Sequence, residues 1–321
     1  MPPFTVGDAL SAARANWQTP VLAGPMASGK SGAALALARE LKGDVRVEIV
    51  SADAMQVYRG LDIGTAKPTA AERAAVPHHL IDVVDPSEPF SVATYVALAE
   101  AAIADVLARG AVPLVAGGTG FYLRALREGL PTVPPANREA QARMWEDVAA
   151  GRIAELDAEL RAAAPLDADR AAMNPRRVVR SLEVLRSTGL PPSAFPPRPP
   201  RFRYRSAHLH PDMSVLRPRI LARTDEMFAA GLVEEVAGLL RRYPDQPTAL
   251  QAIGYKEVAA HVLGEISERE ARAAVAAATT RYAKRQRTWF GAETPELRLL
   301  TTGEEALPEL RRWLAALLGG A

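Results

Sequence analysis

The segment Gly24-Pro25-Met26-Ala27-Ser28-Gly29-Lys30-Ser31 has the G-x4-G-K-[ST] spacing of a phosphate-binding loop. An apolar run at 21–23 precedes it and an alanine- and leucine-rich stretch at 31–41 follows it, so we expect the loop between a strand and a helix. The two glycines let backbone N–H groups turn toward phosphate oxygens, and the helix adds its positive end. Lys30 adds a full charge, and the Ser31 hydroxyl can bind Mg²⁺. The segment therefore predicts an oligophosphate site without specifying the compound.

Around this loop, short apolar stretches alternate with helix-like stretches. We expect strands at 45–50, 80–84 and 112–116, and helices at 91–109 and 121–128. Strands that are apolar throughout and alternate with helices predict a parallel sheet covered on both faces. The expected class is therefore α/β, with a P-loop NTPase-like core.

The alternation stops after residue 130, where several prolines follow. Residues 137–188 have a helical pattern without a strand, and 191–200 contains six prolines, which predicts an extended connector. We therefore predict a P-loop α/β core with C-terminal helices, made of 1–131 and 207–321, and an inserted helical domain at 132–206.

Positive charge is concentrated in two stretches, although the net charge of the chain is only +2. Residues 176–223 contain 11 arginines and two acids, and residues 281–287 add four basic side chains. A clustered positive field suits a polyanion such as nucleic acid, but a solvated basic surface is the alternative.

The composition excludes several classes of protein. The chain has no cysteine, so it has neither disulfides nor thiolate metal sites. No apolar run approaches the roughly 20 residues of a membrane span, and residues 1–16 do not have the pattern of a signal peptide. We expect a cytoplasmic protein without a membrane partner.

Polar residues follow two of the expected strands, at the edge where ligands bind in parallel sheets. Asp53 could be a base, an indirect Mg²⁺ partner or the cap of the next turn. Thr119 lies in the second glycine-rich loop, 117–120, as a hydrogen-bond donor. In the loop 62–68, Thr65 and Lys67 could contact phosphate or substrate, or could belong to a surface loop.

Some conspicuous residues have ordinary structural interpretations. His208 and His210 would share one face of a strand, but no carboxylate partner is evident, so a structural role is favoured over metal binding. The aromatic residues of the basic helix at 281–290 could stack on RNA bases, although packing is the more common role. They are Tyr282, Trp289 and Phe290.

Taken together, the motifs closely resemble the bacterial tRNA dimethylallyltransferases. The resemblance includes the phosphate loop, SADAMQVYRGLDIGTAKP at 51–68, PHHLIDVVDP at 77–86 and GGTGFYLRAL at 117–126. It continues through RRVVRSLEV, QAIGYKE and KRQRTWF, so that it covers roughly residues 20–290.

The resemblance implies an enzyme that transfers a dimethylallyl group from dimethylallyl diphosphate to N6 of the adenine at tRNA position 37, beside the anticodon. Diphosphate leaves, with Mg²⁺ as cofactor. The expected partners are the anticodon loop of tRNA and dimethylallyl diphosphate, and a monomer is expected. The alternatives are a P-loop kinase acting on a nucleotide or small molecule and a non-catalytic RNA-binding protein; a relative that prenylates free AMP is disfavoured by the basic insertion.

The resemblance also implies roles for individual residues. Asp53 would be the general base and Thr119 a contact to the adenine. Diphosphate would be held by Gly24, Pro25, Met26, Ala27, Ser28, Gly29, Lys30, Ser31, Arg219 and Arg223, with Ser31 as the metal ligand. The tRNA would be touched by Asp53, Ala54, Met55, Gln56, Thr119, Arg143, Arg176, Arg177 and Arg180. The chain departs from the family pattern at Met26, where Thr is usual, and at Ala54, where Ser is usual.

Overall fold

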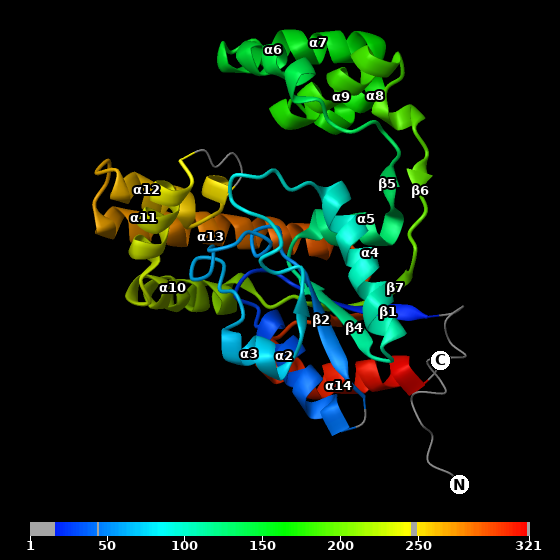
Figure 1. Cartoon of the computed structure of the whole chain (residues 1–321), viewed down its shortest axis with the longest axis vertical. Coiled ribbons are helices and arrows are strands. Elements are labelled where there is room, and N and C mark those ends of the chain that lie inside the picture. The colour runs from blue at the N-terminus through cyan, green and yellow to red at the C-terminus, as the bar shows by residue number, and fades with distance from the viewer. Residues whose placement is uncertain (1–16, 44, 245–248, 320–321) are drawn as a thin grey trace. The chain divides into compact units, whose positions relative to one another are not determined.

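The structure is a computed structural model that describes residues 17–43, 45–244 and 249–319 (Figure 1). The expectation that no signal peptide is present concerns residues 1–16, which lie outside this part. Among the described residues, no helix has both the length and the apolar character needed to cross a membrane.

Two compact units make up the described chain. One combines the residues up to Arg127 with those from Arg201 onward, and the other is Glu128–Pro200. The predicted boundary at 206/207 is wrong, because it would divide the strand β7 (Arg203–Leu209). This strand pairs with β1 (Gln18–Ala23) in the core sheet from its first residue, Arg203, onward.

The core unit contains a six-stranded sheet in the order β3-β2-β4-β1-β7-β8. Every neighbouring pair is parallel, which confirms the predicted α/β class. The remaining strands are β2 (Val47–Ala52), β3 (His78–His79), β4 (Val112–Gly117) and β8 (Leu297–Leu299). The central strands β1 and β4 pair with Ala23 opposite Gly117, so the loops that follow them leave the sheet side by side.

Successive residues of the central strands enter different apolar cores, as the alternation of side chains along a strand requires. Leu22 packs in a core that includes residues of α2 (Lys30–Glu40) and α14 (Gly303–Gly319). Val21 and Ala23 pack in the core of the opposite face, with residues of α4 (Val92–Ala108) and α5 (Gly120–Glu128).

The prediction of a strand at 80–84 is wrong. Leu80 and Asp82 have φ values of +63° and +56°, in the left-handed region, which interrupts an extended strand. Val84 forms only an isolated bridge with Tyr58, and the strand β3 lies before this stretch. The chain instead turns so that Asp82 meets Lys67.

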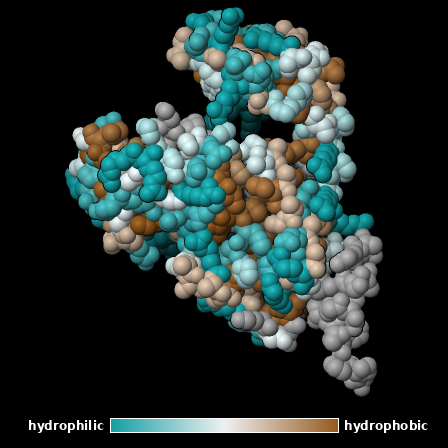
Figure 2. All heavy atoms as spheres, in the orientation of Figure 1, coloured by the Kyte–Doolittle hydropathy of each residue, from teal (hydrophilic) through white to brown (hydrophobic). Residues whose placement is uncertain are grey.

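A group of helices completes the core unit. These are α3 (Ala70–Ala75), α10 (Met213–Ala229), α11 (Leu232–Arg242), α12 (Tyr255–Val262) and α13 (Glu268–Gly291). Leu232, Tyr255 and Val275 from three of them share an apolar core with Val57 and Leu61, which follow β2. Figure 2 shows apolar residues gathered near the middle of the visible face of this unit.

The second unit is mainly helical. Its helices are α6 (Arg138–Ala149), α7 (Ile153–Ala163), α8 (Pro165–Ala171) and α9 (Pro175–Thr188). They bury a separate apolar core around Met144, Leu160 and Leu182. The proline-rich connector is less extended than predicted at its start, because it contains the 3₁₀ turn Pro192–Ala194. Further along it forms the short extended strand β6 (Pro197–Arg198), which pairs antiparallel with β5 (Leu130–Pro131).

Candidate active site

The phosphate loop joins β1 to α2, as predicted. Gly29 has a φ of +82° and is the N-cap of α2 without a side-chain cap, so the first N–H groups of the helix are left open. At Gly24 an added Cβ would lie 3.0 Å from the carbonyl oxygen of Leu209, so the close approach of β7 favours glycine here. The loop thus presents backbone donors at a helix N-terminus, the arrangement that binds anions.

Three distant segments hold the loop from outside. The N–H of Met26 donates to Oε1 of Gln286 (2.8 Å), and Nε of Arg219 donates to the carbonyl oxygen of Ala27 (2.9 Å). The N–H of Gly303 donates to the carbonyl oxygen of Ser28 (2.8 Å). The shape of the loop therefore depends on α10, α13 and α14 as well as on its own sequence.

Asp53 follows β2, and of the three roles considered for it the structure shows the cap. Its Oδ1 accepts hydrogen bonds from the N–H groups of Met55 (2.8 Å) and Gln56 (3.3 Å), so the carboxylate does cap the next turn. The same side chain lines the main cavity of the core unit. One oxygen therefore fixes the orientation of a carboxylate that remains in contact with the cavity.

Thr119 lies at the end of β4, beside Asp53. Its Oγ1 accepts a hydrogen bond from the N–H of Ala54 (3.1 Å), and its own N–H donates to the carbonyl oxygen of Ala52 (3.2 Å). A hydroxyl can donate one hydrogen bond while it accepts another. Thr119 is therefore held by backbone contacts while its proton stays available to a ligand.

One cavity of about 290 Å³ joins these elements. It is lined by Lys30 from the phosphate loop, by Asp53 and by Thr119. Several other lining residues, from α13 and from the segment before α12, were not among the predicted site residues, although Tyr282 was considered for stacking on RNA and Arg285 belongs to the basic stretch 281–287. They are Gln251, Ala252, Ile253, Tyr282, Arg285 and Gln286.

The positive charges near the loop have different environments. Desolvation lowers the pKa of Lys30 to about 8, although the charge of Asp53 raises it, and burial likewise lowers the pKa of Arg223. Arg223 lines a small cavity of about 20 Å³ that shares Met26 with the main one. Arg219 instead pairs with Glu304 (3.0 Å) and lines none of the cavities described here.

The other predicted residues are also separated by the structure. Ser31 lines a cavity of about 110 Å³ together with Ser51 and Gln56. In the second unit, Arg143, Arg176 and Arg177 are exposed. Arg180 is half-buried, pairs with Glu183 (2.6 Å) and donates to the carbonyl oxygen of Pro134.

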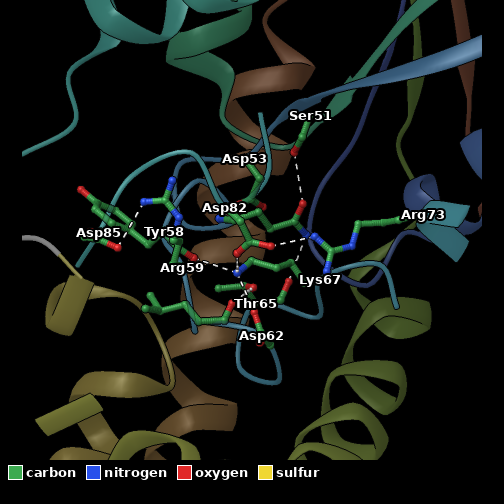
Figure 3. A network of polar contacts seen from close by, with 12 residues as sticks. Ser51, Asp53, Tyr58, Arg59, Asp62, Thr65, Lys67, Arg73, Asp82 and Asp85 are labelled. Carbon is green, nitrogen blue, oxygen red and sulfur yellow. Dashed lines mark hydrogen bonds and ion pairs between the residues drawn. The ribbon is translucent and has the colours of Figure 1, made fainter. Parts of the chain in front are cut away.

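Lys67 is the centre of a network of polar contacts and is not a surface residue (Figure 3). Its side chain is only 3% exposed, and Nζ donates to Asp62 (2.6 Å), Asp82 (2.6 Å) and the carbonyl oxygen of Tyr58 (2.7 Å). Burial alone would raise the pKa of Asp82, but the hydrogen bonds from Lys67 and Arg73 lower it below its usual value. This network fixes the loop that brings Thr65 to the cavity.

Lys67→Met is therefore expected to lower the free energy of unfolding by about 2 kcal/mol, since it leaves partly buried acceptors unpaired. Affinity for inorganic diphosphate should stay within a factor of about 2, well below the roughly tenfold change that 1.4 kcal/mol would cause. Urea unfolding and titration calorimetry measure the two quantities. The exposed Lys256 gives the control variant Lys256→Met. A large loss of diphosphate affinity with unchanged stability would contradict the structural role.

His208, Trp289 and Phe290 make packing contacts within the core unit, whereas Tyr282 lines the cavity. The ring of His208 lies edge-on to that of Phe290, with 5.2 Å between the centroids, and burial lowers the pKa of His208 to about 4. No group of three or more potential metal ligands occurs among the described residues. Trp289 packs under Arg124, whose guanidinium carbon lies 4.1 Å from the ring centroid.

The fold and this cavity define a P-loop protein of the parallel α/β class, in which a phosphate cradle and an oriented carboxylate line one cavity. The family profile described as IPP transferase matches residues 56–293. The chain is 57% identical over 296 residues to the tRNA dimethylallyltransferase of Thermus thermophilus, covering 92% of this chain and 97% of that protein. The chain belongs to the IPP transferase family.

Further relatives agree with this assignment. The tRNA dimethylallyltransferase of Deinococcus radiodurans is 48% identical and covers 84% of this chain and 89% of its own length. The crystal structure of the tRNA isopentenylpyrophosphate transferase from Bacillus halodurans superimposes with a TM-score of 0.68 at 34% identity, covering 94% of this chain and 97% of that one. A eukaryotic dimethylallyltransferase acting on tRNA gives a TM-score of 0.75 at 25% identity, with coverages of 94% and 78%.

Proposed function

We propose that this enzyme transfers the dimethylallyl group of dimethylallyl diphosphate to N6 of the adenine at position 37 of tRNA and releases diphosphate. The observation that carries the proposal is the cavity that Lys30, Asp53 and Thr119 line together. The names of the relatives, which are tRNA dimethylallyltransferases, support the choice of donor and acceptor.

The reaction needs a base on one side of the reacting carbon and stabilisation of the leaving diphosphate on the other. The N6–carbon bond forms as the carbon–oxygen bond to diphosphate breaks, and the amine loses a proton. An exocyclic adenine amine is a weak nucleophile because its lone pair is delocalised, so a nearby base assists the attack. Asp53, oriented through Oδ1, is proposed to accept that proton. The Thr119 hydroxyl is proposed to hold the adenine.

The leaving diphosphate must be stabilised as its charge develops. Lys30, Arg223 and the open N–H groups at the start of α2 are proposed to supply this stabilisation. Mg²⁺ fits the donors present, because the Ser31 hydroxyl and carboxylate and diphosphate oxygens are the hard ligands it prefers. When bound, the ion would neutralise part of the diphosphate charge.

The pKa of Lys30 predicts the pH dependence of donor binding. Only the protonated amine attracts diphosphate, so affinity should be highest below pH 8 and should fall as the pH rises through about 8. Each pH unit above that value should weaken binding up to about tenfold. Calorimetry with inorganic diphosphate between pH 7 and 9.5 measures this. In Lys30→Arg the fall in diphosphate affinity above about pH 8 should be absent, because arginine does not titrate in this range. If the fall were unchanged, a group other than Lys30 would have to cause it.

The exposed arginines at the start of α9 are proposed to bind tRNA phosphates. Arg176→Glu combined with Arg177→Glu should weaken tRNA binding and reduce the slope of log K against log salt by about 1 to 2. Filter binding across a salt series measures both. Arg242→Glu, on an exposed site of α11, is the control. Equal losses in both variants would show only a general charge effect.

The decisive experiment incubates the enzyme with labelled dimethylallyl diphosphate and total tRNA, and then locates the label among the nucleosides. Label on the adenosine beside the anticodon supports the proposal. The alternative, a P-loop kinase, would transfer the γ-phosphate of ATP without RNA and leave the tRNA unlabelled.

A further inference from the structure

The long helix α13 turns one face toward the loops of the site. Three side chains at intervals of four and three residues lie on this face, as the helical repeat requires. They are Tyr282, Gln286 and Trp289. Tyr282 and Gln286 line the cavity. An added Cβ at Gly120 would lie 2.3 Å from Nε1 of Trp289.

Gln286 is the member of this face that touches both site loops. Its Oε1 accepts the N–H of Met26 in the phosphate loop, and its Nε2 donates to the carbonyl oxygen of Gly118, both at 2.8 Å. The residue is 6% exposed. A carboxamide provides a donor and an acceptor in one planar neutral group, which a carboxylate or an aliphatic chain does not.

These two contacts join the site loops in a region where the strands β1 and β4 are no longer paired. The ladder between β1 and β4 ends with Ala23 opposite Gly117. Beyond that pair, the phosphate loop continues toward Lys30 and the other loop toward Thr119. An added Cβ at Gly118 would lie 2.6 Å from Nε2 of Gln286, so the second loop approaches the carboxamide as closely as glycine allows.

We propose that Gln286 is a positioning residue, whose carboxamide sets the spacing between the loop that grips diphosphate and the loop that orients the acceptor adenine. The inference rests on the proposed function. Each loop keeps other supports, Gly303 and Arg219 for the first and Ala52 and Ala54 for the second. Loss of the carboxamide should therefore affect the alignment of the two substrates more than the binding of either.

The main test is Gln286→Glu, which keeps the shape and the acceptor for Met26 but places a negative oxygen against the Gly118 carbonyl. At pH 8 we expect kcat to fall about 100-fold, the loss that a misplacement of about 1 Å can cause. The Michaelis constants for dimethylallyl diphosphate and tRNA should change less than about 3-fold, since ground-state binding is kept. Gln286→Met, which removes both bonds at similar volume, should lose a similar factor.

The pH profile separates positioning from a general structural role. Burial beside a carbonyl oxygen raises the pKa of the introduced carboxyl group, and its protonated form can again donate to Gly118. The kcat of Gln286→Glu relative to that of the wild type should therefore recover as the pH falls from 8 to 6. Gln286→Met should show no such recovery. Thr288→Ala is the matched control, because that exposed hydroxyl bonds only within α13, to Lys284.

A second measurement does not depend on turnover. Inorganic diphosphate should slow hydrogen exchange in both loops of the wild type, but only in the phosphate loop of Gln286→Glu, whose melting temperature is recorded alongside. A kcat within 3-fold of the wild type, a loss confined to the Michaelis constant for the donor, or protection of both loops in the variant would overturn the inference. An inactive wild type that shows coupled protection would instead count against the proposed function alone.

Discussion

Asp53→Asn should reduce kcat for dimethylallyl transfer by about 10³-fold, within the range typical of a lost general base. Asparagine retains the Oδ1 acceptor that Asp53 offers to the N–H groups of Met55 and Gln56, so the turn should keep its geometry. The amide cannot accept a proton from the adenine amine. Single-turnover transfer to tRNA measures the loss, and filter binding should show unchanged tRNA affinity.

The matched control for this variant is Asp85→Asn, because Asp85 is an exposed carboxylate paired with Arg59 on the surface. It should leave kcat unchanged. Turnover of Asp53→Asn close to that of the wild type would remove Asp53 as the base. A loss of folding in Asp53→Asn would show instead that the charge of Asp53, and not only its cap, supports the loop.

The second large effect is expected for Lys30→Met, which should lower kcat/KM for the diphosphate donor by about 10²- to 10³-fold. Lys30 lines the cavity beside Asp53, and its ammonium group is the one that the phosphate loop itself contributes. Methionine retains much of the side-chain volume but has no charge with which to stabilise the leaving diphosphate. Steady-state kinetics at saturating tRNA measure the change.

Lys30→Met should leave the affinity for tRNA alone unchanged. Lys256→Met again serves as the control, since Lys256 is exposed on α12. If Lys30→Met lowered tRNA affinity and left the kinetics for the donor unchanged, the diphosphate would have to bind elsewhere than in the phosphate loop.

Local patterns predicted the parts of the site that consecutive residues build. The phosphate loop and Asp53 each follow a strand directly, and their roles depend on backbone geometry that the same few residues impose. Chemistry in the loop 62–68 was harder to predict, because a lysine in a polar loop resembles a phosphate ligand. The structure assigns Lys67 to an internal ion-pair network, since its acceptor Asp82 lies 15 residues further along the chain.

Similar limits explain the other differences. Arg180 has the same residue type as the exposed Arg176, but the fold places it against the carbonyl oxygen of Pro134. The stretch at 80–84 is apolar enough for a strand, yet the left-handed Leu80 and Asp82 direct the chain to Lys67 instead. In both cases the partner, not the residue type, decides the outcome.

The sequence by itself determined the parallel α/β class, the phosphate loop, the inserted helices and the family resemblance, because these depend on periodicity and on short motifs. Only the tertiary structure decided that Gln286, Tyr282 and Gln251 line the cavity, and that Arg219 supports the phosphate loop from outside. The physical reason is that these contacts join residues as much as 260 positions apart. Local propensities cannot predict such contacts, because they form only when the helices pack on the sheet.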